Sequence, residues 1–392
     1  MYLKKSAIFV KNYLLMELLP DFSNFITTIL SIIFWCLAFI QLFWALFFFL
    51  RISLHKDMIS TNPLPPVSIV IAARNEGDNL VQLLPLILDQ AYENFEVILV
   101  NHQSTDDTEL ILKAFLQKYD HLRLIEIERS KHLNSGKKLP LTVGIKGAKY
   151  DHILLTDADC KPDSRMWLKR MSHQFSPKKE LVLGYAPYQK LPGFLNRIIR
   201  FDTTMIALNY LSFAKARVPF MGIGRNIAYT KELFLKNKGF KSHYSLQSGD
   251  DDLFVQEVAK NKNYTICLSP ETFCVSEPKK TWKDWLTQKT RHYTTSNRYP
   301  LFKKLLLGIY PLSLILLYIS FVTLLINDWL CWISIGVFAF AILIKWIVMG
   351  FAFKRLKQSR FNWTILIWDL FYAILTPIIF YSTDQATEKK WK

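Results

Sequence analysis

The sequence lacks the cysteine patterns of zinc-binding and disulfide-rich proteins. It has five cysteines in 392 residues, and no two of them form a C-x-x-C pair. Zinc fingers and small stapled domains need cysteines paired at short spacing, so the sequence excludes both classes. The odd, scattered set predicts reduced thiols and therefore a globular part that faces a reducing compartment.

Signatures of nucleic-acid binding are also absent. The formal net charge is +17, but Lys and Arg are spread along the chain and form neither a basic helix with heptads nor an RNA-binding motif. The positive charge fits anionic lipid headgroups or phosphorylated substrates better, since each well-placed Lys or Arg gains about 1 kcal/mol at an anionic leaflet. We expect membrane lipids among the partners and no nucleic acid.

Long apolar runs, in contrast, are abundant. Apolar residues make up 51% of the chain, and Phe alone occurs 29 times. Residues 25–50 carry no charge and as a helix would be about 39 Å long, enough to cross a bilayer. This run is too long for a signal peptide and no small-residue cleavage site follows it, so a spanning anchor is predicted. Further spans are expected at 305–326, 329–350 and 363–381.

These patterns divide the chain into segments with different expected roles. The expected segments are an N-terminal stretch 1–24, a span 25–50, a catalytic domain 63–276, an amphipathic interfacial segment 277–300, three spans within 301–382, and a tail 383–392. The basic loop 353–360 is placed in the cytoplasm by the positive-inside rule. This predicts an integral protein of a bacterial cytoplasmic (inner) membrane, with its catalytic domain in the cytoplasm and both termini outside. Lysines near both ends argue against that placement of the termini.

Between residues 63 and 276, short apolar runs alternate with amphipathic stretches. The predicted strands are 67–73, 95–101, 122–127 and 152–159, and the predicted helices include 78–90 and 106–119. Repeated strand–helix–strand order predicts an α/β domain whose mostly parallel sheet is covered on both faces. Ligands of such sheets bind at the carboxyl ends of the strands.

Polar turns follow the first two predicted strands. They contain Arg74, Asn75 and Glu76 in the first turn, and Asn101, His102, Ser104 and Asp106 in the second. Two adjacent turns at the carboxyl edge of a sheet form a natural cradle for a nucleotide. Ordinary helix-capping loops explain the same residues, because Ser and Asp are favoured at helix N-termini.

Asp157 and Asp159 follow the strand predicted at 152–159, two positions apart. Two carboxylates on one face of a turn are hard oxygen ligands of the kind that hold Mg²⁺ or Mn²⁺, and the ion in turn holds a diphosphate. The alternative is a solvated acidic turn, since an isolated D-x-D is a common match.

A run of three acids, Asp250, Asp251 and Asp252, precedes an apolar helical stretch. A carboxylate here is placed to accept the proton of an attacking hydroxyl, the role of a general base. Capping of the helix N-terminus, worth about 0.3–1 kcal/mol, is the alternative. Capping accounts for one or two acids but not for Gly249 or for the third acid.

The last motif lies within residues 281–299. Trp282 and Trp285 are predicted to anchor an amphipathic helix at the membrane surface. Gln288 and Arg291 are one turn apart and present an amide and a cation to one target, and Arg291 is suited to a leaving diphosphate. A basic helix that binds lipid headgroups is the alternative role, through Lys283, Lys289 and Arg298.

With these motifs in this order, residues 65–298 resemble family-2 glycosyltransferases of the GT-A fold, the fold of nucleotide-diphospho-sugar transferases. The membrane-integrated branch of that family, with cellulose, hyaluronan and poly-N-acetylglucosamine synthases and ceramide glucosyltransferase, has similar flanking spans. The resemblance covers a little over half of the chain. It implies a mostly parallel sheet domain with flanking transmembrane helices, a nucleotide-sugar donor (expected to be a UDP-sugar), a lipid or glycan acceptor, a divalent metal and inversion at the anomeric carbon.

The resemblance also assigns expected roles to single residues. It places Glu76, Asn101, His102 and Asp106 at the nucleotide, Gly136 and Lys137 beside the uridine and diphosphate, Asp157 and Asp159 at the metal with Asp157 also facing the nucleotide, and Gly224, Arg225 and Asn226 on the acceptor side. Asp251 matches the family's general base and Asp250 its acidic neighbour. Gln288 and Arg291 match the Q-x-x-R-W signature.

The sequence departs from the family pattern at three places. Asn101 and His102 replace two acids of the nucleotide turn, which leaves base recognition open. His292 stands where the signature has the Trp that helps to bind the acceptor in processive enzymes. Because three acids follow one another, a shift of the motif match by one residue makes Asp250 or Asp252 the base. The rival hypothesis is a catalytically inactive GT-A-fold scaffold subunit of a polysaccharide synthesis or export assembly, which has no need to retain the full acidic set with Gln288 and Arg291.

Overall fold

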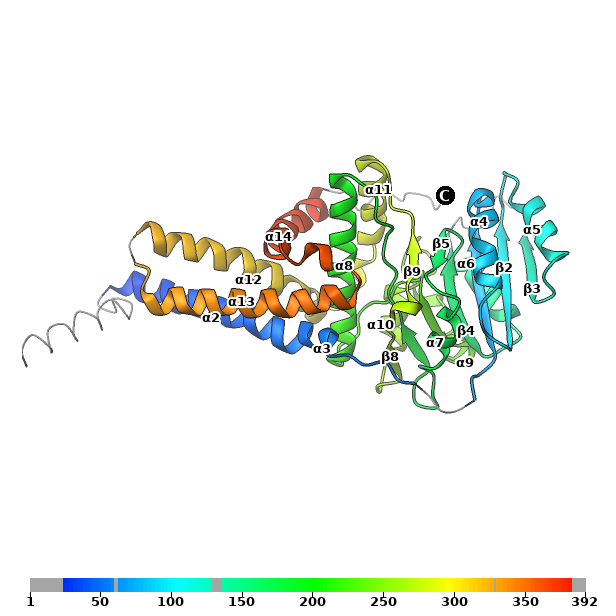
Figure 1. The fold of residues 1–392 in the computed structure, drawn as a ribbon, viewed down its shortest axis with the longest axis horizontal. Coiled ribbons are helices and arrows are strands. Elements are labelled where there is room, and N and C mark those ends of the chain that lie inside the picture. Colours follow the sequence, from blue (N-terminus) through cyan, green and yellow to red (C-terminus); the bar gives the residue numbers. More distant parts are fainter. Residues whose placement is uncertain (1–23, 60–62, 129–135, 328, 383–392) are drawn as a thin grey trace, which may run out of the picture. The chain divides into compact units, whose positions relative to one another are not determined.

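A computed structural model, drawn in Figure 1, describes residues 24–59, 63–128, 136–327 and 329–382. The expected tail 383–392 and all but the last residue of the expected N-terminal stretch 1–24 lie outside these residues. The chain divides into two compact units, a helical unit within 1–53, 300–354 and 358–378, and a globular unit built mainly from 54–299.

The helical unit consists of long apolar helices. Helix α2 (Phe25–Phe43) runs through a π-helical turn (Trp44–Phe49) into α3 (Leu50–Ser53), and the others are α12 (Leu301–Ile326), α13 (Trp332–Arg355) and α14 (Ile365–Ser382). Within the described residues, four helices are long and apolar enough to cross a membrane: Phe25–Ser53, Leu301–Ile326, Trp332–Arg355 and Ile365–Ser382. Phe34 of α2, Leu317 of α12 and Ala341 of α13 pack in one buried cluster.

A buried polar network joins the four apolar helices. Lys345 and Asp369, each 1% exposed, form an ion pair with Nζ 2.5 Å from Oδ2. Lys345 also donates to Gln41 at 2.8 Å, and the Tyr310 hydroxyl donates to Asp369 at 2.8 Å. Because charges removed from water need close partners, this network ties each helix to the others.

The globular unit contains a seven-stranded sheet. Its strands are β1 (Val67–Ala73), β2 (Phe95–His102), β3 (Leu122–Ile127), β4 (His152–Asp157), β6 (Leu181–Leu183), β7 (Ile227–Thr230) and β8 (Tyr264–Ile266), in the order β3-β2-β1-β4-β7-β6-β8. All neighbours are parallel except β7, which is antiparallel to β4 and β6. The predicted mostly parallel sheet is confirmed. All seven residues of β1 are buried, as expected of a strand covered on both faces.

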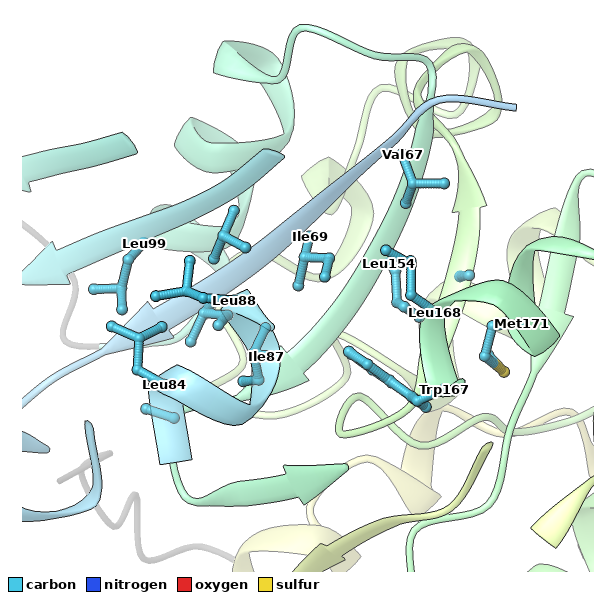
Figure 2. Close-up of a cluster of buried hydrophobic side chains, with 14 of the residues drawn as sticks. Val67, Ile69, Leu84, Ile87, Leu88, Leu99, Leu154, Trp167, Leu168 and Met171 are labelled. Carbon is cyan, nitrogen blue, oxygen red and sulfur yellow. The ribbon is translucent and has the colours of Figure 1, made fainter. Parts of the chain in front are cut away.

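Helices cover the sheet on both faces. Side chains of α4 (Gly77–Leu88) and α7 (Trp167–Ser172), among them Leu84, Ile87 and Trp167, pack with Ile69 of β1 in the cluster shown in Figure 2. Alternate residues of a strand face opposite sides, so Val70 faces the other way, toward α6 (Lys138–Gly147). Gly144 permits this close approach, because a Cβ there would lie 2.5 Å from Val70 Cγ1.

The remaining elements are shorter or lie outside this sheet. They are α5 (Thr108–Leu116), β5 (Cys160–Pro162), α8 (Phe194–Lys215), α9 (Lys231–Lys236), α10 (Asp252–Val258), β9 (Cys274–Ser276) and α11 (Trp282–Tyr293), with short 3-10 turns at Lys241–His243, Pro270–Thr272, Ser296–Arg298 and Ser359–Phe361. The last turn named, Ser359–Phe361, belongs to the helical unit. Strand β5 pairs antiparallel with β9. The segment just after Asp157 is thereby fixed to residues more than a hundred positions later.

Two predictions for the segment 281–299 are wrong. Trp285 is 2% exposed, so it is a core residue rather than a membrane-surface anchor. Lys289, expected to bind lipid headgroups in the alternative reading, is 5% exposed and lies with Nζ 2.7 Å from Oδ1 of Asp202 on α8. A helical pattern of charge and aromatics does not distinguish an exposed cation from a buried, paired one.

We expect the buried pair of the helical unit to be worth more than a surface pair. Lys345→Met should lower the free energy of unfolding by about 3–5 kcal/mol, because it leaves the Asp369 carboxylate buried without its cation. The double variant Lys345→Met with Asp369→Leu should recover most of that loss. Thermal unfolding of the full chain in detergent measures both.

The matched control is Lys113→Met, which removes an exposed ion pair whose side chains are 59% and 52% accessible. It should cost less than about 1 kcal/mol. Equal losses for the Lys345 and Lys113 variants would contradict the importance assigned to the buried network.

Candidate functional site

The two polar turns after β1 and β2 are joined by hydrogen bonds. The Ser104 hydroxyl accepts from the Asn75 N–H at 3.0 Å, and the Asn75 side chain accepts from the Thr105 N–H at 2.7 Å. The Asp106 carboxylate accepts from the Gly77 N–H at 3.1 Å. Burial alone raises the pKa of Asp106, but the Thr108 hydroxyl and the backbone N–H groups outweigh it and lower that pKa. Asp106 therefore stays ionised and holds the first turn to the second.

Asn101 and His102 are the last two residues of β2 and are 6% and 0% exposed. Burial, and then the charge of Arg74, lower the pKa of His102 to about 4. His102 is therefore neutral at pH 7. The positions where the resembled family has two acids thus carry a neutral amide and a neutral imidazole. Glu76, on the neighbouring turn, accepts from the Asn79 amide at 2.6 Å.

Lys137 links the two acidic motifs. Its ammonium forms an ion pair with Asp157 and lies 3.8 Å from Oδ2 of Asp250. Burial alone raises the pKa of Asp157, but Lys137, Arg225 and Arg291 outweigh it and lower that pKa. Burial likewise works against the charge of Lys137, whose pKa is nevertheless raised by Asp157 and Asp250. Acids almost a hundred positions apart are therefore brought together around one cation.

The antiparallel strand β7 brings the segment 224–226 to this edge. Leu155 near the end of β4 pairs with Ile227 at the start of β7, so the residues just before β7 lie beside Asp157. The Gly224 N–H donates to Asp251 Oδ2 at 2.9 Å. Asn226 is 0% exposed and donates to the carbonyls of Tyr185 and Thr272. It anchors the segment in the core, which directs Gly224 and Arg225 to the site.

Arg225 belongs to a short chain of contacts across the site. Its guanidinium carbon lies 4.4 Å from the centre of the Tyr188 ring, and it donates to the Ser276 hydroxyl at 2.6 Å. The Tyr188 hydroxyl accepts from the Gln288 amide at 3.0 Å. Gln288 and Arg291 both lie on α11, and the charge of Arg291 lowers the pKa of Asp157. Helix α11 thus brings both side chains to the site. Sequence reasoning missed Tyr188, although its position shortly after the apolar run 181–183 placed it near a strand end.

Asp251 differs from its two acidic neighbours. It is the N-cap of α10 and accepts from the N–H groups of Gly224 and Asp252. Burial, then Asp250 and Asp252, raise the pKa of Asp251 to about 7. Asp252 is 5% exposed and accepts from the Thr295 hydroxyl and, at 2.7 Å, from the Tyr299 hydroxyl. Asp252 is committed to internal bonds, which favours Asp251 over Asp252 as a proton acceptor.

A divalent ion fits the D-x-D pair by the chemistry of its ligands. In the part of the chain that the structure describes, no group of three or more His, Cys, Asp and Glu side chains gathers to hold a metal. Mg²⁺ commonly takes one or two protein carboxylates and completes its shell with substrate phosphates and water. Asp157 and Asp159 supply such a pair. Gly136, the residue before Lys137, borders open space, since a Cβ on Gly136 would meet nothing within 4 Å.

Comparison with known proteins finds similarity over part of the chain. Residues 68–236 match the family model described as Glycosyl transferase family 2. The chain is 26% identical over 251 residues to "Probable glycosyltransferase YdaM" of Bacillus subtilis, covering 61% of this chain and 57% of that protein. It is 24% identical over 253 residues to the poly-beta-1,6-N-acetyl-D-glucosamine synthase of Staphylococcus aureus, covering 60% and 58%. The match thus spans less than two thirds of the length of both relatives.

A solved structure shows the same fold. The mannosyltransferase PcManGT from Pyrobaculum calidifontis, in complex with GDP-Man and Mn²⁺, superimposes with a TM-score of 0.54 at 18% identity. The match covers 88% of this chain and 99% of that one. At this identity the likeness shows the fold alone.

The backbone before the acidic run requires glycine. Gly249 has φ +103°, and a Cβ there would lie 2.8 Å from Leu253 Cδ1. Gly249→Ala should therefore lower the free energy of unfolding by about 1–3 kcal/mol. Thermal unfolding of the full chain measures it, with Gly136→Ala as the control because its Cβ enters open space. Equal stability of the two variants would contradict the strain assigned to Gly249.

Proposed function

We propose that this chain, which carries a glycosyltransferase family 2 domain of the GT-A fold, moves a sugar from a nucleotide-sugar donor to a lipid or polysaccharide acceptor. The observation that carries the proposal is a carboxyl, Asp251, with a pKa of about 7, whose neighbour Asp250 is linked through Lys137 to the D-x-D residue Asp157. A carboxyl titrating near neutral pH is suited to proton transfer. On the other side of Lys137, the neighbourhood of Asp157 is suited to a diphosphate.

The proposed reaction is a direct displacement. The acceptor hydroxyl oxygen attacks the anomeric carbon as the bond from that carbon to the diphosphate oxygen breaks, and the sugar inverts its configuration. The Asp251 carboxylate takes the hydroxyl proton, and the nucleoside diphosphate leaves with the electron pair. Asp251 is held for this by the N–H groups of Gly224 and Asp252. The attacking oxygen thus gains its nucleophilic charge as the bond forms.

Positive charge on the donor side stabilises the leaving group in this proposal. Lys137 and Arg291 are placed to neutralise the diphosphate, because preorganised charges act strongly where water is excluded. Asp157 and Asp159 would hold a Mg²⁺ or Mn²⁺ ion, which would supply Lewis-acid charge to the same diphosphate. On the nucleotide side we propose Glu76, Asn101, His102, Asp106 and Gly136. Asn101 and His102 place neutral groups where the resembled family has acids, and we propose UDP-sugars as the donors to try first.

The four apolar helices support a membrane-bound acceptor, either a lipid or a growing glycan. We propose an integral protein of the cytoplasmic membrane with the family-2 domain on the cytoplasmic side, since the basic loop 353–360 favours that orientation. The test is to incubate the purified full chain with a panel of nucleotide sugars and Mg²⁺ or Mn²⁺ and to measure nucleoside diphosphate release. Added membrane lipids separate lipid from polymer acceptors. Donor binding with no release under any condition would instead support the inactive scaffold.

The role of Asp251 gives a specific prediction. Asp251→Asn should leave nucleoside diphosphate affinity near that of the wild type and reduce transfer by at least about 100-fold, because the amide cannot accept the proton. Product formation and calorimetric binding measure the two effects. The control is Asp107→Asn, an exposed acid before α5, which should leave both unchanged. Wild-type transfer by the Asp251 variant would rule out Asp251 as the base.

The raised pKa of Asp251 predicts the pH dependence of the reaction. A general base works only when it is deprotonated, so kcat/KM should fall as pH drops through about 7, rather than through the value of about 4 of an ordinary Asp. kcat/KM is the right quantity, because it reports the free enzyme. A profile that stays flat from pH 8 to pH 5 would contradict the assignment.

A further inference from the structure

Lys138, the residue after Lys137, has no part in the proposed chemistry and lies in an unusual environment. It is the first residue of the helix and only 2% exposed. Its ammonium donates to three backbone carbonyls, those of His243 at 2.9 Å, Leu246 at 2.6 Å and Ser248 at 2.5 Å. An ammonium has three N–H bonds, so all of them are used on one segment of the chain.

The buried first position of a helix does not favour a lysine. A cation at a helix N-terminus is opposed by the helix dipole, and burial lowers the pKa of Lys138, although Asp250, Asp252 and Asp251 oppose this. Burying a cation is costly, and the three hydrogen bonds to carbonyls offset this cost. Here they fix the backbone of residues 243–248.

That backbone leads directly to the acidic run. Ser248 is followed by Gly249, with its φ of +103°, and then by Asp250 and Asp251. The residue before Lys138 is Lys137, which pairs with Asp157 and lies 3.8 Å from Asp250. Lys137 therefore holds the Asp157 carboxylate, and Lys138 holds the backbone that leads to Asp251.

We propose that Lys138 is a positioning residue, whose hydrogen bonds to the carbonyls of His243, Leu246 and Ser248 set the place of Asp251 relative to Asp157. The inference rests on the proposed function, in which Asp251 must meet an acceptor bound opposite the donor. Lys138 is 2% exposed and uses its three N–H bonds on the backbone, so we expect it to contact neither substrate. Its loss should therefore slow the chemical step and leave donor binding intact. A misplacement of about 1 Å can cost about 100-fold in rate.

The other end of α6 supplies a matched control. Lys231 donates to the carbonyls of Lys146 at 2.9 Å and Ala148 at 2.8 Å, which close the C-terminal end of the same helix. Lys231 follows β7, whose last residue Thr230 pairs with His152 at the start of β4. It therefore lies at the sheet edge opposite to Asp157. Lys231→Met removes the same kind of bond far from the acids.

The experiment compares Lys138→Met and Lys231→Met in the full chain in detergent micelles. We measure kcat and KM for the donor chosen by the nucleotide-sugar panel, the affinity for its nucleoside diphosphate, and amide hydrogen exchange over residues 241–252. Lys138→Met should lower kcat by about 100-fold, leave nucleoside diphosphate affinity unchanged and speed exchange in this segment. Lys231→Met should leave kcat and this exchange unchanged.

A second variant covers the case in which Lys138→Met does not fold. Lys138→Arg keeps the charge, but its planar guanidinium does not match three carbonyls that converge on one point; it should lower kcat with unchanged nucleoside diphosphate affinity. Unchanged kcat in a folded Lys138 variant, an equal fall in the Lys231 variant, or a fall without faster exchange overturns the inference. A wild-type chain that transfers no sugar overturns the proposed function instead, and the exchange comparison then still decides whether Lys138 holds the segment.

Discussion

The globular unit depends on one cation that keeps two acidic motifs together. Asp157 ends a central strand and Asp250 precedes α10, and Lys137 pairs with the first and lies 3.8 Å from the second. Without a positive charge between them, carboxylates at this spacing and burial would repel each other. The same contact therefore brings the Asp157 carboxylate to the acidic run that contains Asp251, whose pKa is raised to about 7.

The neighbouring cations are fixed by structure that lies further away. Asn226 anchors the segment that carries Arg225, and the buried pair Lys289–Asp202 joins α11, which carries Gln288 and Arg291, to α8. Tyr188 lies between, with its ring against Arg225 and its hydroxyl bonded to Gln288. Groups held in this way need little reorganisation when charge develops on a leaving group. Rigid support from buried residues is thus part of the proposed chemistry.

Much of the fold followed from the sequence, and so did the position of acids at one edge of its sheet. Continuous apolar runs such as 67–73 predict buried parallel strands, and acids directly after such a run predict a site at the sheet edge. The pairing of Lys137 with Asp157, the role of Tyr188, and the antiparallel direction of β7 did not follow, because each depends on contacts between distant segments. Trp285 and Lys289 were misassigned for the same reason: helical periodicity gives the faces of a helix but not what covers them. Asp106 was expected at the nucleotide, and what the structure shows is a carboxylate that holds two turns together.

The central claim is that Lys137 couples the donor side of the site to the acidic run, and a double-mutant cycle tests it most directly. Lys137→Met, Asp250→Asn and the double variant are compared with the wild type by kcat in the full chain. Coupled residues should give a non-additive result of about 0.5–3 kcal/mol in activation free energy. Additive effects of the two substitutions would contradict the claim that this cation joins the two halves of the site.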